Sequence, residues 1–91
     1  MMMTVRDNKE RHRFELDVEG GTAFASYVMT PAALVITHTE TPRALRGRGI
    51  ASDLVKGALE LIRADGRKVR AGCSFVADYL ERHPEHADIV G

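Results

Sequence analysis

The residues best suited to chemistry form one short segment, positions 46–51, which reads Arg-Gly-Arg-Gly-Ile-Ala. Glycines let a backbone approach a phosphate closely with its N–H groups pointing inward. Arg46 and Arg48 add charge-assisted hydrogen-bond donors. The segment leads into a stretch of helical periodicity, and the first N–H groups of a helix lack partners while the helix dipole adds positive potential. These residue types in this order predict an anion site, called here the 46–51 loop.

An isolated Gly-x-Gly pair marks only a tight turn roughly half the time, so the glycines alone would be weak support for a ligand site. Four features coincide here: the glycines, the flanking arginines, a preceding strand and a following helix. Two familiar phosphate loops are excluded. The chain has no Gly-x-x-x-x-Gly-Lys-Ser/Thr sequence, and Ser52 stands where a GxGxxG pattern requires glycine.

Two titratable side chains on the preceding strand are candidates for proton transfer. Alternate residues of a strand share one face, and at residues 34–41 we expect that face to run from the core to a cleft. It carries two apolar and then two titratable side chains, namely Leu34, Ile36, His38 and Glu40. Histidine is the residue type that titrates near neutral pH, so His38 suits a base. An alternative of equal weight is that both side chains simply lie at the end of a strand and take no part in chemistry.

Cys73 follows a predicted short strand and precedes a predicted helix, where helix N–H groups favour a thiolate. A nucleophilic role and that of an inert, small, buried hydrophobic residue both remain open for it. His83 and His86 are three residues apart, but no third metal ligand with suitable spacing is evident. We therefore expect a solvated surface there and no metal site.

The elements that must position these residues form one α+β domain over residues 1–91. The predicted elements are strands at residues 11–18, 22–29 and 34–41, a helix at Ile50–Ala64, a short strand at 68–72 and a helix at 74–83. Glycines at Gly20 and Gly66 mark a turn and a helix end, and Pro84 stops the last helix. The order β-β-β-α-β-α predicts a mostly antiparallel sheet with helices packed on it and a right-handed parallel crossover around the main helix.

The 46–51 loop matches an (Arg/Gln)-x-x-Gly-x-(Gly/Ala) signature, and the chain resembles the GCN5-related N-acetyltransferase (GNAT) superfamily. The resemblance covers residues 33–90: positions 37–41 look like the family's fourth strand, Ile50–Ala64 like its long helix and 68–73 like its fifth strand. The chain looks like the minimal, single-domain subfamily of GNAT proteins. It departs from a full-length GNAT at its front, where a strand and a Gly-Gly turn replace the usual helical pair, so the fold is a truncated GNAT-like fold.

The resemblance implies that the cofactor is acetyl-CoA and that the 46–51 loop wraps its pyrophosphate. The residues it implies for cofactor binding are Thr39, Thr41, Arg46, Gly47, Arg48, Gly49, Ile50, Ala51 and Ser52. Backbone N–H groups near Thr39 to Thr41 would polarise the thioester carbonyl. Because the missing front helices often help to bind the acceptor in the family, the resemblance speaks more strongly for cofactor binding than for acceptor recognition.

The resemblance also suggests catalytic roles. Glu40 resembles in position the glutamate that some GNAT enzymes use as a base, and His38 is the alternative base. Tyr79 resembles the family's tyrosine that protonates the departing thiolate, with a packing role as the alternative. Cys73 is expected near the cofactor, where a covalent acyl-cysteine step is the minority interpretation.

Three functions are compatible with these features: an N-acetyltransferase acting on an amine acceptor, a non-catalytic coenzyme A-binding module and, as a distant third, a nucleic-acid-binding module. Positions 43–70 hold eight basic and three acidic side chains, a balance of +5 in a chain of zero net charge. That local field suits an anionic ligand, but no aromatic residues interleave with the basic ones as a nucleic-acid platform requires. We expect a monomer or weak homodimer that binds neither nucleic acid nor membrane. A single cysteine and the lack of a long apolar run favour the cytoplasm.

Overall fold

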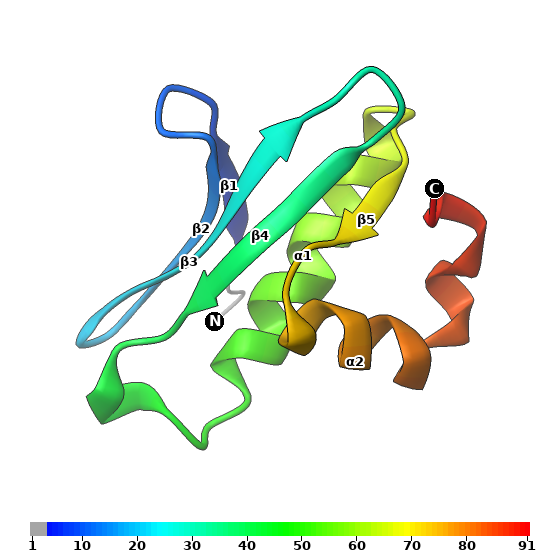
Figure 1. Ribbon diagram of the computed structural model, residues 1–91. Coiled ribbons are helices and arrows are strands. Elements are labelled where there is room, and N and C mark those ends of the chain that lie inside the picture. Colours follow the sequence, from blue (N-terminus) through cyan, green and yellow to red (C-terminus); the bar gives the residue numbers. More distant parts are fainter. Residues whose placement is uncertain (1–3) are drawn as a thin grey trace.

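Within residues 4–91, which the computed structural model describes, five strands form one sheet in the order β1-β2-β3-β4-β5 (Figure 1). The first three methionines of the expected domain at residues 1–91 lie outside the described part. The strands are β1 (Val5–Asn8), β2 (Arg13–Val18), β3 (Gly21–Met29), β4 (Leu34–Glu40) and β5 (Val69–Ala71). The pairs from β1 to β4 are antiparallel, whereas β5 lies parallel to β4. The parallel pair is joined by a crossover through the helix α1 (Ile50–Ala64).

The amphipathic pattern of α1 explains how this helix covers one face of the sheet. Its apolar side chains recur every three or four residues and are buried, namely Ile50, Leu54, Val55, Ala58, Leu59 and Ile62. The helix contacts β1, β2, β3 and β4. At Gly57 it lies so close to β1 that an added Cβ would be 2.3 Å from Val5 Cγ2. Gly66 adopts a φ of 71°, a left-handed conformation suited to the end of a helix.

The second helix, α2 (Ser74–Arg82), packs against α1 and against β4 and β5, with Val76 and Tyr79 buried. Two short 3-10 helices complete the chain: η1 (Arg43–Leu45) leads into the 46–51 loop, and η2 (Pro84–Ile89) follows α2. After η2 the backbone N–H of Gly91 donates to the Val69 carbonyl at 2.9 Å. The C-terminal residues therefore lie beside β5, as Figure 1 shows.

The structure confirms the α+β class, the mostly antiparallel sheet and the parallel crossover around the main helix. One strand was missed, so the order is β-β-β-β-α-β-α with two 3-10 helices, rather than β-β-β-α-β-α. The sequence of β1 contains Val5 as its only apolar residue, and pairing with β2 makes it a strand. Across residues 4–91, no helix is both long enough and apolar enough to cross a membrane.

A β-bulge in β4 contradicts the expectation that His38 and Glu40 share a face with the two apolar residues before them. Ile36 pairs with Tyr27, but His38 pairs with Ser26, so β4 carries one extra residue at Thr37. Directly paired residues lie on the same face of a sheet. His38 and Glu40 consequently face away from α1, because a one-residue shift moves every later side chain to the other face.

Candidate functional site

Two glycines in left-handed conformations build the 46–51 loop. Gly47 has a φ of 84°, and Gly49 has a φ of 75° at the N-cap of α1. Side chains are strained at such values, so the path of the loop requires glycine. An added Cβ at either position would meet nothing within 4 Å, so open space lies in front of both.

The N-terminus of α1 leaves its first N–H groups available to a ligand. The first helical hydrogen bond runs from the Asp53 N–H to the Gly49 carbonyl at 3.0 Å. The N–H groups of Ile50, Ala51 and Ser52 therefore precede the helical bonding pattern. Among the described residues, no side chain caps this end of the helix. Unpartnered N–H groups and the positive end of the helix dipole favour an anion here.

A cavity of about 200 Å³ lies at this end of α1. Its lining residues are Thr41, Leu45, Arg46, Gly47, Gly49, Ile50, Ala51, Ser52 and Phe75. The Arg46 Nε donates to the Thr41 carbonyl at 3.3 Å, which ties the loop to the end of β4. The structure thus gathers seven of the nine residues expected to bind a cofactor, while Arg48 and Thr39 lie outside the lining.

The edge of β4 is free beyond the bulge. β5 pairs only with Leu34, Val35 and Ile36, and the Gly72 N–H donates to the Ile36 carbonyl at 2.7 Å. Over the next residues, β4 has β3 on one side and, within the described part of the chain, no paired strand on the other. The free edge leads directly to Thr41 and the 46–51 loop. Its backbone groups can pair with an extended ligand as a strand would.

His38 and Glu40 lie together at the end of β4. The His38 Nε2 is 3.7 Å from the Glu40 Oε2, and the side chains are 61% and 52% exposed. The His38 ring meets the ring of Phe24 edge to face, with centroids 6.3 Å apart. Both side chains are therefore accessible from the outer face of the sheet.

Tyr79 lies in α2, which contacts both β4 and α1, and its side chain is buried. Its ring stacks on His83 at a centroid distance of 4.0 Å and lies 6.1 Å from the ring of His86. Burial raises the pKa of the Tyr79 hydroxyl, and the nearby carboxylates of Glu85, Asp53 and Glu60 raise it further. The phenol therefore stays protonated at neutral pH and keeps a proton that it can donate.

Cys73 is the N-cap residue of α2 and is partly buried against the core. Its carbonyl accepts the Ala77 N–H at 3.1 Å, the first hydrogen bond of the helix. Neither Cys73 nor the other three residues predicted to be catalytic lines the cavity at the 46–51 loop. Within residues 4–91, no three histidine, cysteine or acidic side chains are grouped to hold a metal ion.

Two residues that line the cavity, Phe75 and Leu45, were not predicted from the sequence. Phe75 is 38% exposed at the start of α2 and adds an apolar side chain to the lining of the cavity. An exposed phenylalanine on a mostly polar helix was the available signal. Leu45 is buried, and a Cβ on Gly20 would lie 3.4 Å from its side chain. The β2–β3 turn therefore packs against the residue that precedes the 46–51 loop.

Comparisons with known proteins show the family of the chain. A family model described as GCN5-related N-acetyl-transferase matches residues 13–89. Protein NATD1 of Mus musculus is 31% identical over 83 residues, which cover 88% of this chain and 76% of that protein. Protein NATD1 of Danio rerio is 28% identical over 85 residues, covering 90% and 77%. A GCN5-like protein of Staphylococcus aureus, solved by NMR, superposes with a TM-score of 0.73 at 25% identity, covering 98% of this chain and 88% of that one. The chain belongs to the GCN5-related N-acetyltransferase family.

Proposed function

We propose that this chain is an acetyl-CoA-dependent N-acetyltransferase that binds the cofactor's pyrophosphate on the 46–51 loop. The observation that carries the proposal is the N-terminus of α1. It presents unpartnered N–H groups behind two left-handed glycines, with open space where a Cβ would stand. Phosphate groups bind such helix ends through both hydrogen bonds and the helix dipole. Arg46 and Arg48 add positive charge beside it.

The free edge of β4 supports a path for the rest of the cofactor. Its pantetheine arm is an extended chain with amide groups, which can pair with the backbone beyond the bulge. A backbone N–H near Thr39 would then be available to stabilise charge on the thioester carbonyl oxygen. When bound, acetyl-CoA supplies an acetyl group activated as a thioester.

The placement of the titratable residues suits acceptor entry from the outer face of the sheet. His38 or Glu40 accepts a proton from the acceptor amine on that face. Acetyl-CoA held by the 46–51 loop would supply its acetyl group to the amine nitrogen as the carbon–sulfur bond breaks, and Tyr79 would donate a proton to the leaving sulfur. His38 and Glu40 face away from α1, whereas Tyr79 lies near Asp53 and Glu60 of α1. Base and acid would therefore act from opposite faces of the sheet.

The experiment compares cofactor affinity among matched variants by isothermal titration calorimetry. The double variant Arg46→Ala, Arg48→Ala is expected to bind acetyl-CoA at least about tenfold more weakly, since each hydrogen bond to a charged group contributes roughly 1.5–3 kcal/mol. Arg11→Ala is the control for loss of an arginine elsewhere: it removes one positive charge, against two in the double variant, from the exposed β1–β2 turn at the other end of β2 from the loop. Equal affinity in the double variant and wild type would refute the phosphate assignment.

A coenzyme A-binding module without catalysis is the second candidate. It is favoured by the separation of the predicted catalytic residues, since none of the four lines the cavity of the loop. A screen of amine acceptors, following release of free thiol, separates the two functions. Tight binding without turnover on any amine favours the module, whereas turnover that Glu40→Gln or His38→Ala lowers favours the enzyme.

A further inference from the structure

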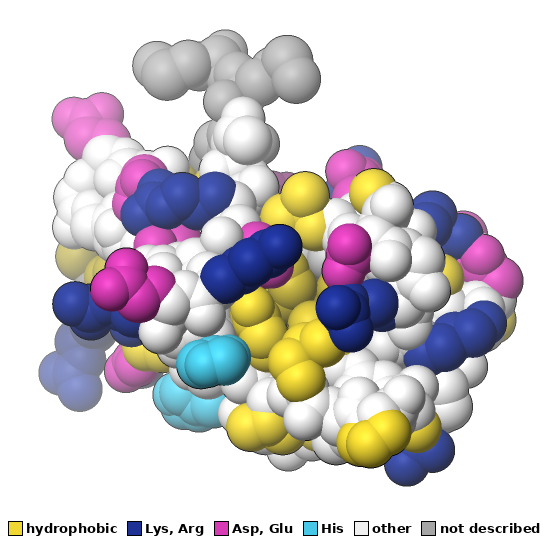
Figure 2. Space-filling model, turned by 90° about the horizontal axis from the view of Figure 1, so that it is seen from above, with side chains coloured by type: hydrophobic (Ala, Val, Ile, Leu, Met, Phe, Trp, Pro, Cys, Tyr) yellow, Lys and Arg dark blue, Asp and Glu magenta, His cyan; other side chains and the backbone are white. Residues whose placement is uncertain are grey.

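A second and larger cavity, of about 470 Å³, lies at the opposite end of α1 from the 46–51 loop. A helix rises about 1.5 Å per residue, so the ends of this helix are roughly 20 Å apart. The cavity is lined by Asp7, Lys9, His12, Phe14, Tyr27, Met29, Leu34, Leu61, Ile62, Ala64, Asp65 and Arg67. Figure 2 shows an apolar hollow on this side of the molecule, with basic side chains on both sides of it. Its volume lies within the range of sites that hold small molecules.

The floor of this cavity is apolar and partly aromatic. The rings of Phe14 and Tyr27 lie 4.9 Å apart between centroids, and the His12 ring meets Tyr27 edge to face at 5.9 Å. At the rim, Met29 and Leu61 leave 42% and 36% of their surfaces exposed. Large apolar side chains gathered in a concave surface are typical of a ligand site.

The acidic groups of the cavity already have donors. The Tyr27 hydroxyl donates to Asp7 Oδ1 at 2.6 Å, and the Arg67 Nε donates to Asp65. Burial and the hydrogen bond to Asp7 raise the pKa of Tyr27 to about 12, so its hydroxyl remains a donor. Each carboxylate therefore has a donor at one of its two oxygens, and Asp65 is already paired with a cation.

The basic groups keep unused donors. In the part of the chain that the structure describes, the Lys9 ammonium makes no hydrogen bond or ion pair with another side chain. Arg67 bonds to Asp65 through Nε, so both of its terminal nitrogens remain available as donors to a ligand. The cavity thus offers unused cationic donors, the Lys9 ammonium and the terminal nitrogens of Arg67, above an apolar floor.

We propose that this cavity binds a small organic acid with an apolar or aromatic body. The body packs on Phe14, Tyr27 and Leu61, and the carboxylate bonds to Lys9 and to the terminal nitrogens of Arg67. An amine of the same shape would meet these two cations, and the carboxylates of the cavity are already shared with Tyr27 and Arg67. This site is separate from the proposed cofactor site, because the two share no lining residue.

The test is a titration with octanoate, compared with octanol and octylamine, monitored by amide chemical shifts. We expect saturable octanoate binding in the millimolar range or tighter, with shifts centred on the cavity and affinities for octanol and octylamine about fivefold lower or weaker. Lys9→Ala should lower octanoate affinity toward that of octanol, with the remaining preference carried by Arg67. Lys56→Ala, which removes an exposed lysine of α1 outside the cavity, should change nothing.

Three results would overturn the proposal: no saturable octanoate binding, octylamine binding as tightly as octanoate, or an unchanged octanoate affinity in Lys9→Ala. Acetyl-CoA affinity is measured on the same Lys9→Ala sample and is expected to equal that of wild type. Loss of octanoate binding with intact cofactor binding therefore separates this site from the proposed function.

Discussion

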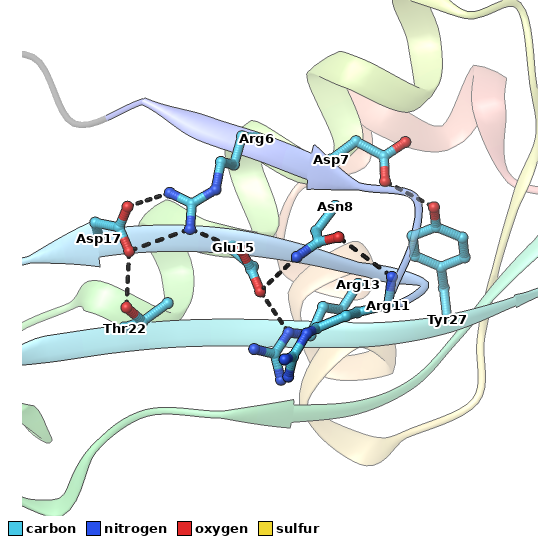
Figure 3. Close-up of polar contacts among 9 residues, drawn as sticks. All are labelled: Arg6, Asp7, Asn8, Arg11, Arg13, Glu15, Asp17, Thr22 and Tyr27. Carbon is cyan, nitrogen blue, oxygen red and sulfur yellow. Dashed lines mark hydrogen bonds and ion pairs between the residues drawn. The ribbon is translucent and has the colours of Figure 1, made fainter.

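Replacing Glu15 with glutamine tests the ion-pair network that joins β1 and β2 on the outer face of the sheet (Figure 3). The Glu15 side chain is only 4% exposed. Its carboxylate accepts hydrogen bonds from Arg6 at 2.7 Å, Asn8 at 3.2 Å and Arg13 at 2.5 Å. Glutamine keeps the shape of the side chain but removes the charge and turns one acceptor into a donor facing arginines.

The expected cost follows from burial. Removing one partner of a fully buried ion pair costs about 3–5 kcal/mol. Arg6 and Arg13 are 52% and 26% exposed, so water can solvate the guanidinium groups that lose Glu15. We therefore expect a loss of about 2 kcal/mol of unfolding free energy, or roughly 10 °C in melting temperature for a domain of this size.

Asp17→Asn is the matched control for the urea and thermal unfolding experiments. Asp17 also pairs with Arg6, but its side chain is 56% exposed. Exposed ion pairs contribute little to stability, so this variant should lose far less than Glu15→Gln. Equal losses in the two variants would refute the argument that burial makes Glu15 important.

Further predictions concern pH, packing and turnover. Burial raises the pKa of Glu15, but hydrogen bonds from arginine and asparagine side chains outweigh this effect and hold the pKa below 4.5. In unfolding experiments run at a series of pH values, the stability advantage of wild type over Glu15→Gln should be full above pH 4.5. It should fade as the pH falls through the lower pKa of the folded state. Gly72→Val should lower the free energy of unfolding in urea by about 1–3 kcal/mol, because the added Cβ would lie 2.9 Å from the Ile36 carbonyl oxygen. Unchanged stability would mean that β4 and β5 can move apart without cost. Tyr79→Phe and Glu40→Gln should each lower turnover with a working amine and leave acetyl-CoA affinity unchanged; full turnover would remove those roles.

The helices and the loop were readable from the sequence because local signals determine them. Apolar spacing predicted the bounds of α1, and the glycines with flanking arginines predicted an anion site where the structure has a cavity. Pairing partners decide the parts that were missed. β1 has a single apolar residue, Val5, and becomes a strand through its bonds to β2 and its contact with Gly57.

The bulge at Thr37 is the other feature that the alternation pattern did not reveal. A simple period of two places His38 with Ile36, whereas the extra residue moves His38 to the opposite face. Likewise, the second cavity joins residues from β1 to the C-terminal end of α1, and no local pattern connects positions so distant in the chain. Sites built from one contiguous segment were predictable, and sites assembled across the sheet were not.

The most direct test of the account is calorimetric titration of the wild-type chain with acetyl-CoA, with acetate and duplex DNA as controls. We predict saturable binding of acetyl-CoA at one site and no binding of either control. Absence of acetyl-CoA binding would mean that the 46–51 loop is only a turn, and the proposed transferase would be contradicted despite the family to which the chain belongs.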